Sequence, residues 1–237
     1  MAGYAPTIYL RNTFRMKWDK DNAYLRTFLE GKQKFIQSPK TRDWKLVAAF
    51  AEWPLLKEQH VAQPDFDIIQ IWRLADWPVL YRTMVDLSET SWYRRLGATL
   101  TSENQELLIN AGVREPHTEI HWSQDDHPGY TYVYEVSRPK EGRNQAYLRE
   151  VNWLSARMSA RYRWELVWWA SQITAQPAQL SILWRVLDPD GSNIVQQLVD
   201  IAQTERYNER TLAYVQTLER RIYHPIYTER LAQLAAG

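Results

Sequence analysis

The chain of 237 residues carries 29 lysines and arginines against 28 aspartates and glutamates, so its formal net charge is +1 and a nucleic-acid partner is not expected. It has no cysteine, which excludes disulfides, a thiolate nucleophile and cysteine metal ligands. No uncharged apolar stretch approaches the roughly 20 residues of a membrane-spanning helix and no secretory signal is recognisable, so we expect a cytoplasmic protein without a membrane partner.

The first half of the chain is predicted to form strand, helix, strand, strand and helix. β-branched and aromatic residues favour strands, whereas apolar residues three or four positions apart favour helices. On these patterns we expect strands at 7–16, 44–53 and 66–77, and helices at 23–37 and 79–100. A short helix at 102–112 follows, and residues 117–124 are predicted as a closing fourth strand.

The second half repeats this order. We expect strands at 130–138, 163–173 and 178–188, and helices at 142–160 and 192–221. The remaining residues, 223–237, contain Pro225 and show no pattern of a fourth strand.

Four collinear matches indicate that the two halves are copies. AYLR occurs at 23–26 and again at 146–149. The other matches are WKLV with WELV, IWRL with LWRV, and VDLSETSWY with VDIAQTERY. Collinear identities at a nearly constant offset are the signature of an internal repeat. We therefore place one repeat at 1–125 and the second at 130–237, and we expect the tyrosines of the two AYLR motifs to be core residues.

The element order β-α-β-β-α is that of a ferredoxin-like unit, which leaves one face of its sheet without helices. Two such units in tandem are predicted to pack sheet to sheet as an α+β barrel and to pair further as a homodimer. On its doubled AYLR, W-x-L-V, W-R and V-D-[LI]-x-x-T-x-x-Y patterns, the chain resembles the dimeric α+β barrel superfamily and, within it, the NIPSNAP-like proteins. The resemblance implies a varied set of activities that includes haem-dependent chlorite dismutase-like proteins, monooxygenases, lyases and isomerases.

Three residues are candidate catalysts. Glu165 and Glu135 are carboxylates within aromatic strands, where burial would make a carboxyl group suitable for acid–base work. His121 shares a strand face with Glu119 and is the third candidate, although two ligands alone do not predict a metal site.

The substrate-binding candidates are aromatic or cationic strand residues. They are Arg73, Arg185, Trp72, Trp184 and Trp169. The two arginines match between the copies and could bind an anionic or carbonyl-bearing ligand. The alternative is a structural ion pair for each arginine, with Asp76 for Arg73 and Asp188 for Arg185. Strand alternation predicts that Trp168 lies on the same face as Trp164, and that Trp169 lies on the same face as Glu165.

The leading hypothesis is an enzyme that uses acid–base chemistry on a small, partly aromatic or apolar molecule held in the barrel. It would be a lyase, isomerase or cyclase without a nucleotide, flavin or metal. One alternative, implied by the resemblance, is a haem protein of the chlorite dismutase-like kind. Another is a non-enzymatic oligomeric interaction protein that uses its 12 tryptophans and 14 tyrosines at an interface.

Overall fold

The computed structural model describes a large part of the chain in two compact units. The described residues are 8–16, 23, 24, 26–28, 30, 45–52, 66–74, 80, 81, 90–109, 131–172, 179–187 and 193–225. Unit 1 contains the residues up to Leu108, and unit 2 contains residues 128–224. No helix among the described residues combines the length and the apolar character needed to cross a membrane.

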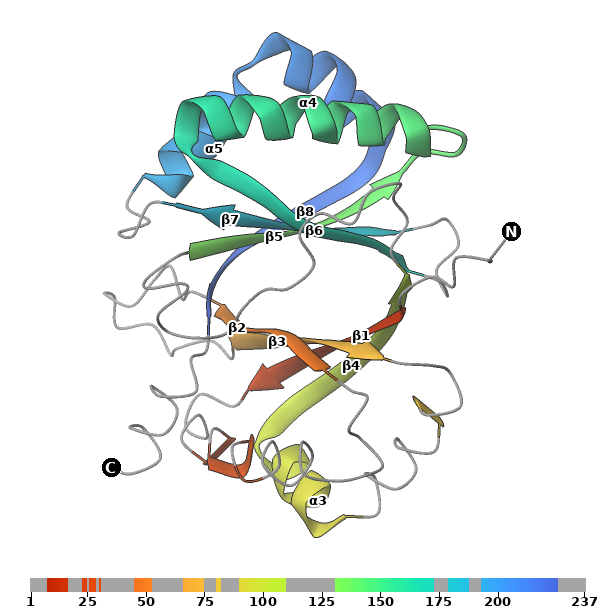
Figure 1. Ribbon diagram of the computed structural model, residues 1–237, viewed down its shortest axis with the longest axis vertical. Coiled ribbons are helices and arrows are strands. Elements are labelled where there is room, and N and C mark those ends of the chain that lie inside the picture. Colours follow the sequence, from red (N-terminus) through yellow and green to blue (C-terminus); the bar gives the residue numbers. More distant parts are fainter. Residues whose placement is uncertain are drawn as a thin grey trace. The chain divides into compact units, whose positions relative to one another are not determined.

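Unit 1 is a four-stranded sheet with helical residues packed on one face (Figure 1). Its strands are β1 (Ile8–Met16), β2 (Lys45–Glu52), β3 (Phe66–Leu74) and β4 (Leu100–Ile109). Their order is β2-β3-β1-β4, and β3 pairs antiparallel with β1 and with β2. Helix α3 (Ser91–Ala98) precedes β4, and the described residues between 23 and 30 are helical.

The core of unit 1 forms between this sheet and its helical residues. Leu10 of β1 lies opposite Trp72 of β3, and both side chains are buried on the helix-facing side. Tyr24 and Phe28 come from the first AYLR helix and pack into the same cluster, with their ring centroids 6.1 Å apart. The prediction that Tyr24 is a core residue is therefore confirmed.

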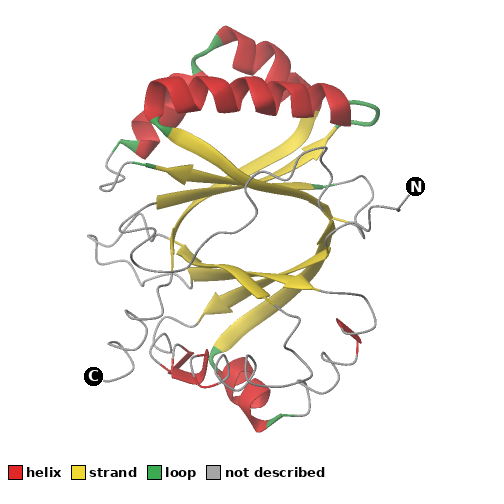
Figure 2. Ribbon diagram, viewed as in Figure 1, coloured by secondary structure: helices red, strands yellow, loops and turns green. Residues whose placement is uncertain are grey.

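Unit 2 repeats the arrangement (Figure 2). Its strands are β5 (Thr131–Pro139), β6 (Trp164–Gln172), β7 (Leu180–Val186) and β8 (Val215–Pro225), and their order is β6-β7-β5-β8. Helices α4 (Asn144–Tyr162) and α5 (Ile194–Ala202) lie over one face of this sheet. Numbered within its own unit, each sheet has the order 2-3-1-4, so the duplication of an α+β, ferredoxin-like unit is confirmed.

The predicted long helix at 192–221 is wrong. Helix α5 ends at Ala202, and a π-helical turn (Tyr207–Thr211) and a 3₁₀ turn (Leu212–Tyr214) follow before β8 begins at Val215. Residues 215–225 were assigned to the helix end and tail, because so short an apolar pattern fits both the helical and the strand period. Pairing with β5 along Tyr132–Pro139 decides in favour of the strand.

The same error occurs in unit 1. Residues 102–112 were predicted to be helical, but residues up to Ile109 form β4, the fourth strand of this sheet. The stretch 117–124, which was predicted to be that strand, lies outside the described residues. In both units the fourth strand is therefore supplied by a polar sequence whose strand character depends on its partner strand.

Each second strand contains a β-bulge at the same place. The register shifts between Leu46 and Ala48 on β2 and between Leu166 and Trp168 on β6. The extra residue reverses the alternation of the residues that follow. Trp168 therefore lies on the face of Glu165 and not on that of Trp164, so the predicted faces of Trp168 and Trp169 are corrected. A bulge conserved between the copies also supports the duplication.

Candidate functional site

Four residues form a row across the sheet of unit 2. Glu165 on β6 lies opposite Arg185 on β7, and Arg185 lies opposite Tyr132 on β5. Tyr132 in turn lies opposite Tyr223 on β8. Residues paired in this way share one face of a sheet. We call these four residues the Glu165 row.

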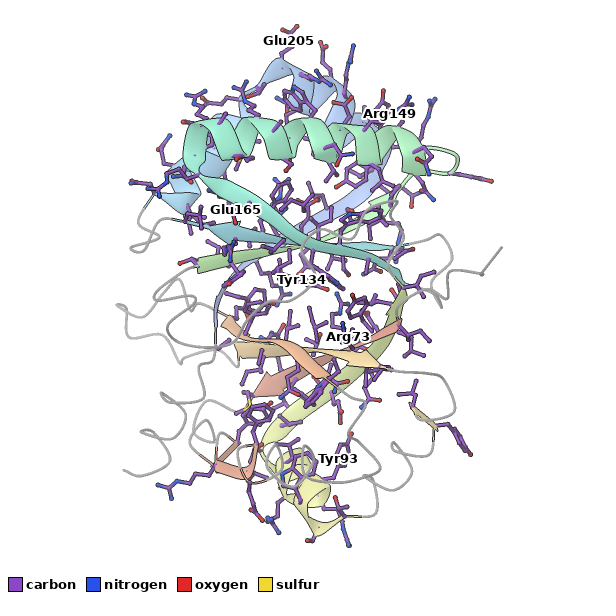
Figure 3. The ribbon with its side chains drawn as sticks, in the orientation of Figure 1. Arg73, Tyr93, Tyr134, Arg149, Glu165 and Glu205 are labelled. Atoms are coloured by element: carbon purple, nitrogen blue, oxygen red, sulfur yellow. The ribbon has the colours of Figure 1, made fainter. Side chains whose placement is uncertain are left out.

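The Glu165 row lies on the face of the sheet that points away from the helices. On β5, Glu135 accepts a hydrogen bond from the hydroxyl of Tyr147 on α4, at 2.7 Å, so this strand position faces the helices. Because successive strand residues point to opposite faces, Tyr132 and Tyr134 face the other way. Glu165 and Tyr134 are labelled on their strands in Figure 3.

Glu165 and Arg185 form an ion pair within this row. Arg185 Nε donates to Glu165 Oε2 at 3.1 Å, and Arg185 Nη2 donates to the same oxygen. The side chain of Glu165 is 40% exposed and that of Arg185 is 23% exposed. A pair this exposed stabilises a fold by no more than about 1 kcal/mol, so folding energetics alone give little reason for its presence. Glu165 is thus a fixed, solvent-accessible carboxylate.

Aromatic side chains lie on the same face of the sheet as this pair. Tyr132 and Tyr223 are 1% and 2% exposed, and the ring of Tyr134 meets that of Tyr223 edge to face at 6.3 Å. Trp168 reaches this face because of the bulge in β6 and lies opposite Leu183. The arrangement places a carboxylate and a guanidinium on a sheet face that is otherwise built from buried aromatic rings.

Unit 1 has a related row with a different charge. Tyr9 on β1 lies opposite Arg73 on β3, and Arg73 lies opposite Lys45 on β2. The tyrosine and the arginine therefore match those of unit 2, while a lysine stands where unit 2 has Glu165. Figure 3 labels Arg73 on β3. Asp76, the expected ion-pair partner of Arg73, lies outside the described residues.

Glu135 lies on the opposite face of the unit 2 sheet from Glu165. Its carboxylate, 2% exposed, accepts from Arg220 Nε of β8 at 2.8 Å as well as from Tyr147. Arg220 in turn lies over the ring of Tyr207 at 5.3 Å. Burial, reinforced by the charge of Glu135, raises the pKa of Tyr147 well above its ordinary value. This environment is that of a structural ion pair, and catalysis by Glu135 stays a prediction.

The three candidate tryptophans lie on the helix-facing sides of the sheets. Trp72 donates through Nε1 to Gln70 within the core of unit 1. Trp184 is 2% exposed and its ring lies 6.5 Å from that of Trp164. Trp169 is opposite Ile182 and is half-buried. Substrate binding by these residues stays a prediction, because the surroundings observed for them are those of packing residues.

Two members of the Glu165 row were not among the sequence candidates. Tyr132 was hidden among the alternating aromatics of β5, and Tyr223 belongs to β8, which was not recognised as a strand. Arg185 and Glu165 were both predicted, but as separate candidates. No sequence pattern joins them, because their pairing depends on the register between β6 and β7.

The comparisons with known proteins identify the fold. No protein-family profile and no curated protein matches this sequence. Among solved structures, an anthrone oxidase-like protein matches 93% of this chain and 92% of its own length, with 10% identity and a TM-score of 0.64. A putative monooxygenase from Fusobacterium nucleatum matches 94% of each chain, with 12% identity and a TM-score of 0.58. A chlorite dismutase variant from Candidatus Nitrospira defluvii matches 97% of this chain and 95% of its own, with 10% identity and a TM-score of 0.55.

The chain has the dimeric α+β barrel fold. These matches confirm the predicted likeness in fold. A NIPSNAP family protein from Agrobacterium tumefaciens is also similar, over 45% of this chain at a TM-score of 0.33 and 18% identity. At these identities the matches show the fold alone, and a shared fold does not specify a function.

The haem alternative depends on histidines that the structure does not describe. His121 lies outside the described residues, and of the five histidines only His224 has a described backbone, within β8. The described side chains therefore supply no imidazole that could serve as an axial ligand. They also contain no cluster of three or more potential metal ligands. The haem alternative and the expectation of no metal site both stay predictions.

Proposed function

We propose that this α+β barrel protein is an enzyme that performs acid–base chemistry on a small, partly aromatic or apolar organic molecule. The observation that carries the proposal is the Glu165–Arg185 ion pair, which is partly exposed beside aromatic rings on the helix-free face of unit 2. The reaction is of the lyase, isomerase or cyclase type and requires no nucleotide or flavin.

In this proposal Glu165 is the base. The two hydrogen bonds that Arg185 donates to Glu165 end on Oε2, so Oε1 is the oxygen that accepts a proton from the substrate. Arg185 holds the carboxylate in one position and also stabilises negative charge that develops on the substrate as the proton leaves. The buried rings of Tyr132 and Trp168 make the surroundings of this pair apolar.

A second candidate is an oxidase or oxygenase that uses the same residues. The support is the likeness to a protein described as anthrone oxidase-like and to a putative monooxygenase. Removal of a proton from an activated methylene group leaves a carbanion that can react directly with molecular oxygen. The overall change converts the methylene group and O2 into a carbonyl group and water. Proton abstraction by Glu165 would be the shared first step of both candidates.

The test is turnover of a panel of small aromatic ketones, phenols and anthrone-type compounds, followed by mass spectrometry and oxygen consumption. Glu165→Gln keeps the shape of the side chain but removes its basicity, and we expect a loss in kcat on the order of 100-fold or more. The matched control is Glu205→Gln, an exposed carboxylate in the helical layer. Oxygen uptake separates the second candidate from the first. Equal rates for Glu165→Gln and the wild type would refute the role of this site.

We also propose that the protein is a homodimer, which its dimeric α+β barrel neighbours support. Sedimentation at several concentrations tests this assembly, and a single monomeric species throughout would contradict it. An interaction protein without activity remains the alternative, and a lack of turnover across the panel together with stable oligomers would favour it.

A further inference from the structure

The two units differ in charge at one register position. In unit 2, Arg185 lies opposite Glu165 and the two side chains form an ion pair. At the matching position of unit 1, Arg73 lies opposite Lys45. The bulge that follows at the same place in β2 and β6 establishes that these positions are equivalent. Unit 1 therefore has the same arginine, but the residue type at the opposing position is basic where unit 2 has an acidic one.

The other arginines on this face of unit 1 are paired. Arg11 forms an ion pair with Glu106, and Arg15 forms one with Asp67 at 3.0 Å. Among the residues that the structure describes, no carboxylate makes such a pair with Arg73, which is only partly buried. Like charges at opposed positions of neighbouring strands destabilise a sheet. An external anion at this position would offset that cost.

We propose that unit 1 binds the carboxylate of a small organic acid at Arg73. The guanidinium fork matches the two oxygens of a carboxylate, and a lysine, Lys45, occupies the opposing register position. Tyr9 lies opposite Arg73, and Ile71 lies two residues before it on the same face. Both side chains are 1% exposed, so the acid binds at the accessible part of the Arg73 side chain. This site goes beyond the proposed function, because it is independent of whether Glu165 is a catalyst.

The probes are benzoate, phenylacetate and cinnamate, with the corresponding neutral amides as controls, measured by calorimetry and thermal shift. We expect one binding site per chain for at least one acid and none for its amide. Arg73→Gln removes the charge and should weaken binding by about 10- to 100-fold, the size of a charge-assisted hydrogen bond. Arg185→Gln is the matched control and should bind as the wild type does, because Arg185 is already neutralised by Glu165.

Exchanging the residues that differ between the units provides the decisive variants. Lys45→Glu gives unit 1 the charges of unit 2, so Arg73 gains an internal partner and the acid should be lost while the circular dichroism spectrum is unchanged. Glu165→Lys makes the reverse change and should raise the stoichiometry to two.

If Arg73→Gln does not fold, Lys45→Glu still tests the site because it retains Arg73. The proposal would be overturned if the wild type bound none of the acids. It would also be overturned if Arg73→Gln and Lys45→Glu both bound an acid with wild-type affinity. Loss of activity in Glu165→Gln with unchanged acid binding concerns the catalytic proposal alone.

Discussion

The buried ion pair between Glu135 and Arg220 should be a major determinant of the stability of unit 2. Glu135 is 2% exposed and Arg220 is 18% exposed, and they are joined at 2.8 Å. The other carboxylate oxygen accepts from Tyr147 at 2.7 Å. Arg220→Met keeps most of the volume but leaves a buried carboxylate without its counter-charge. We expect this variant to lose about 3–5 kcal/mol of unfolding free energy, the usual cost of removing one partner of a buried pair.

A double-mutant cycle, measured by urea unfolding with tryptophan fluorescence, separates the cost of leaving one charge unpaired from the net contribution of the ion pair to stability. In Glu135→Leu/Arg220→Met no charge remains buried, so we expect the double variant to be more stable than Arg220→Met alone. The control is Arg95→Met, which breaks an exposed pair with Glu30 whose side chains are 50% and 43% exposed; its effect should stay below about 1 kcal/mol. A loss of less than 1 kcal/mol for Arg220→Met as well, or additive losses in the double variant, would refute the reasoning.

The remaining predictions concern tyrosine ionisation and helix ends. Burial raises the pKa of both Tyr24 and Tyr147, with Glu135 adding to the effect on Tyr147. Unfolded tyrosines lose their protons near pH 10 while these two keep theirs, so stability should fall above about pH 10, by up to about 1.4 kcal/mol per pH unit for each. An ultraviolet titration in which all 14 tyrosines of the folded protein ionise together near pH 10 would contradict this. Thr90 accepts a hydrogen bond from the backbone N–H of Tyr93 at the start of α3, at 3.1 Å; Thr90→Ala should cost about 1 kcal/mol in urea unfolding, and Thr90→Ser should restore most of it. Arg163 ends α4 in the left-handed region, with φ of 59°; Arg163→Gly should raise the melting temperature through a gain of about 0.5–1 kcal/mol, and a lower melting temperature would show that the arginine side chain matters more than the backbone.

Much of the fold could be predicted because the strands and helices near the repeated motifs have strong local patterns. The strand alternation of residues 7–16 and 130–138 and the helical spacing after Ala146 are each sufficient to assign an element. The fourth strands could not be predicted in the same way. In β8, polar and apolar residues alternate too briefly to distinguish the two periods, and its strand structure depends on hydrogen bonds to β5.

The candidate site was predicted residue by residue but not as an arrangement. Glu165 and Arg185 were both identified as candidates, each for its charge within an apolar strand. Their pairing required the register between β6 and β7. Asp188, the other expected partner of Arg185, lies outside the described residues. Glu135 was predicted on the same grounds as Glu165, although only the fold reveals that it lies beneath α4, bound to Tyr147.

By itself the sequence determined that the chain is a duplication, that each copy begins with a strand and a tyrosine-bearing helix, and that the copies diverge at Lys45 and Glu165. These are properties of local pattern and of identity within one chain, and they need no knowledge of distant contacts. The tertiary structure alone decided which carboxylate is exposed, which arginine each carboxylate meets, and which face each residue of β6 occupies after the bulge. The physical reason is that charge pairing and strand facing depend on register between strands, and a shift of one residue moves every later side chain to the opposite face.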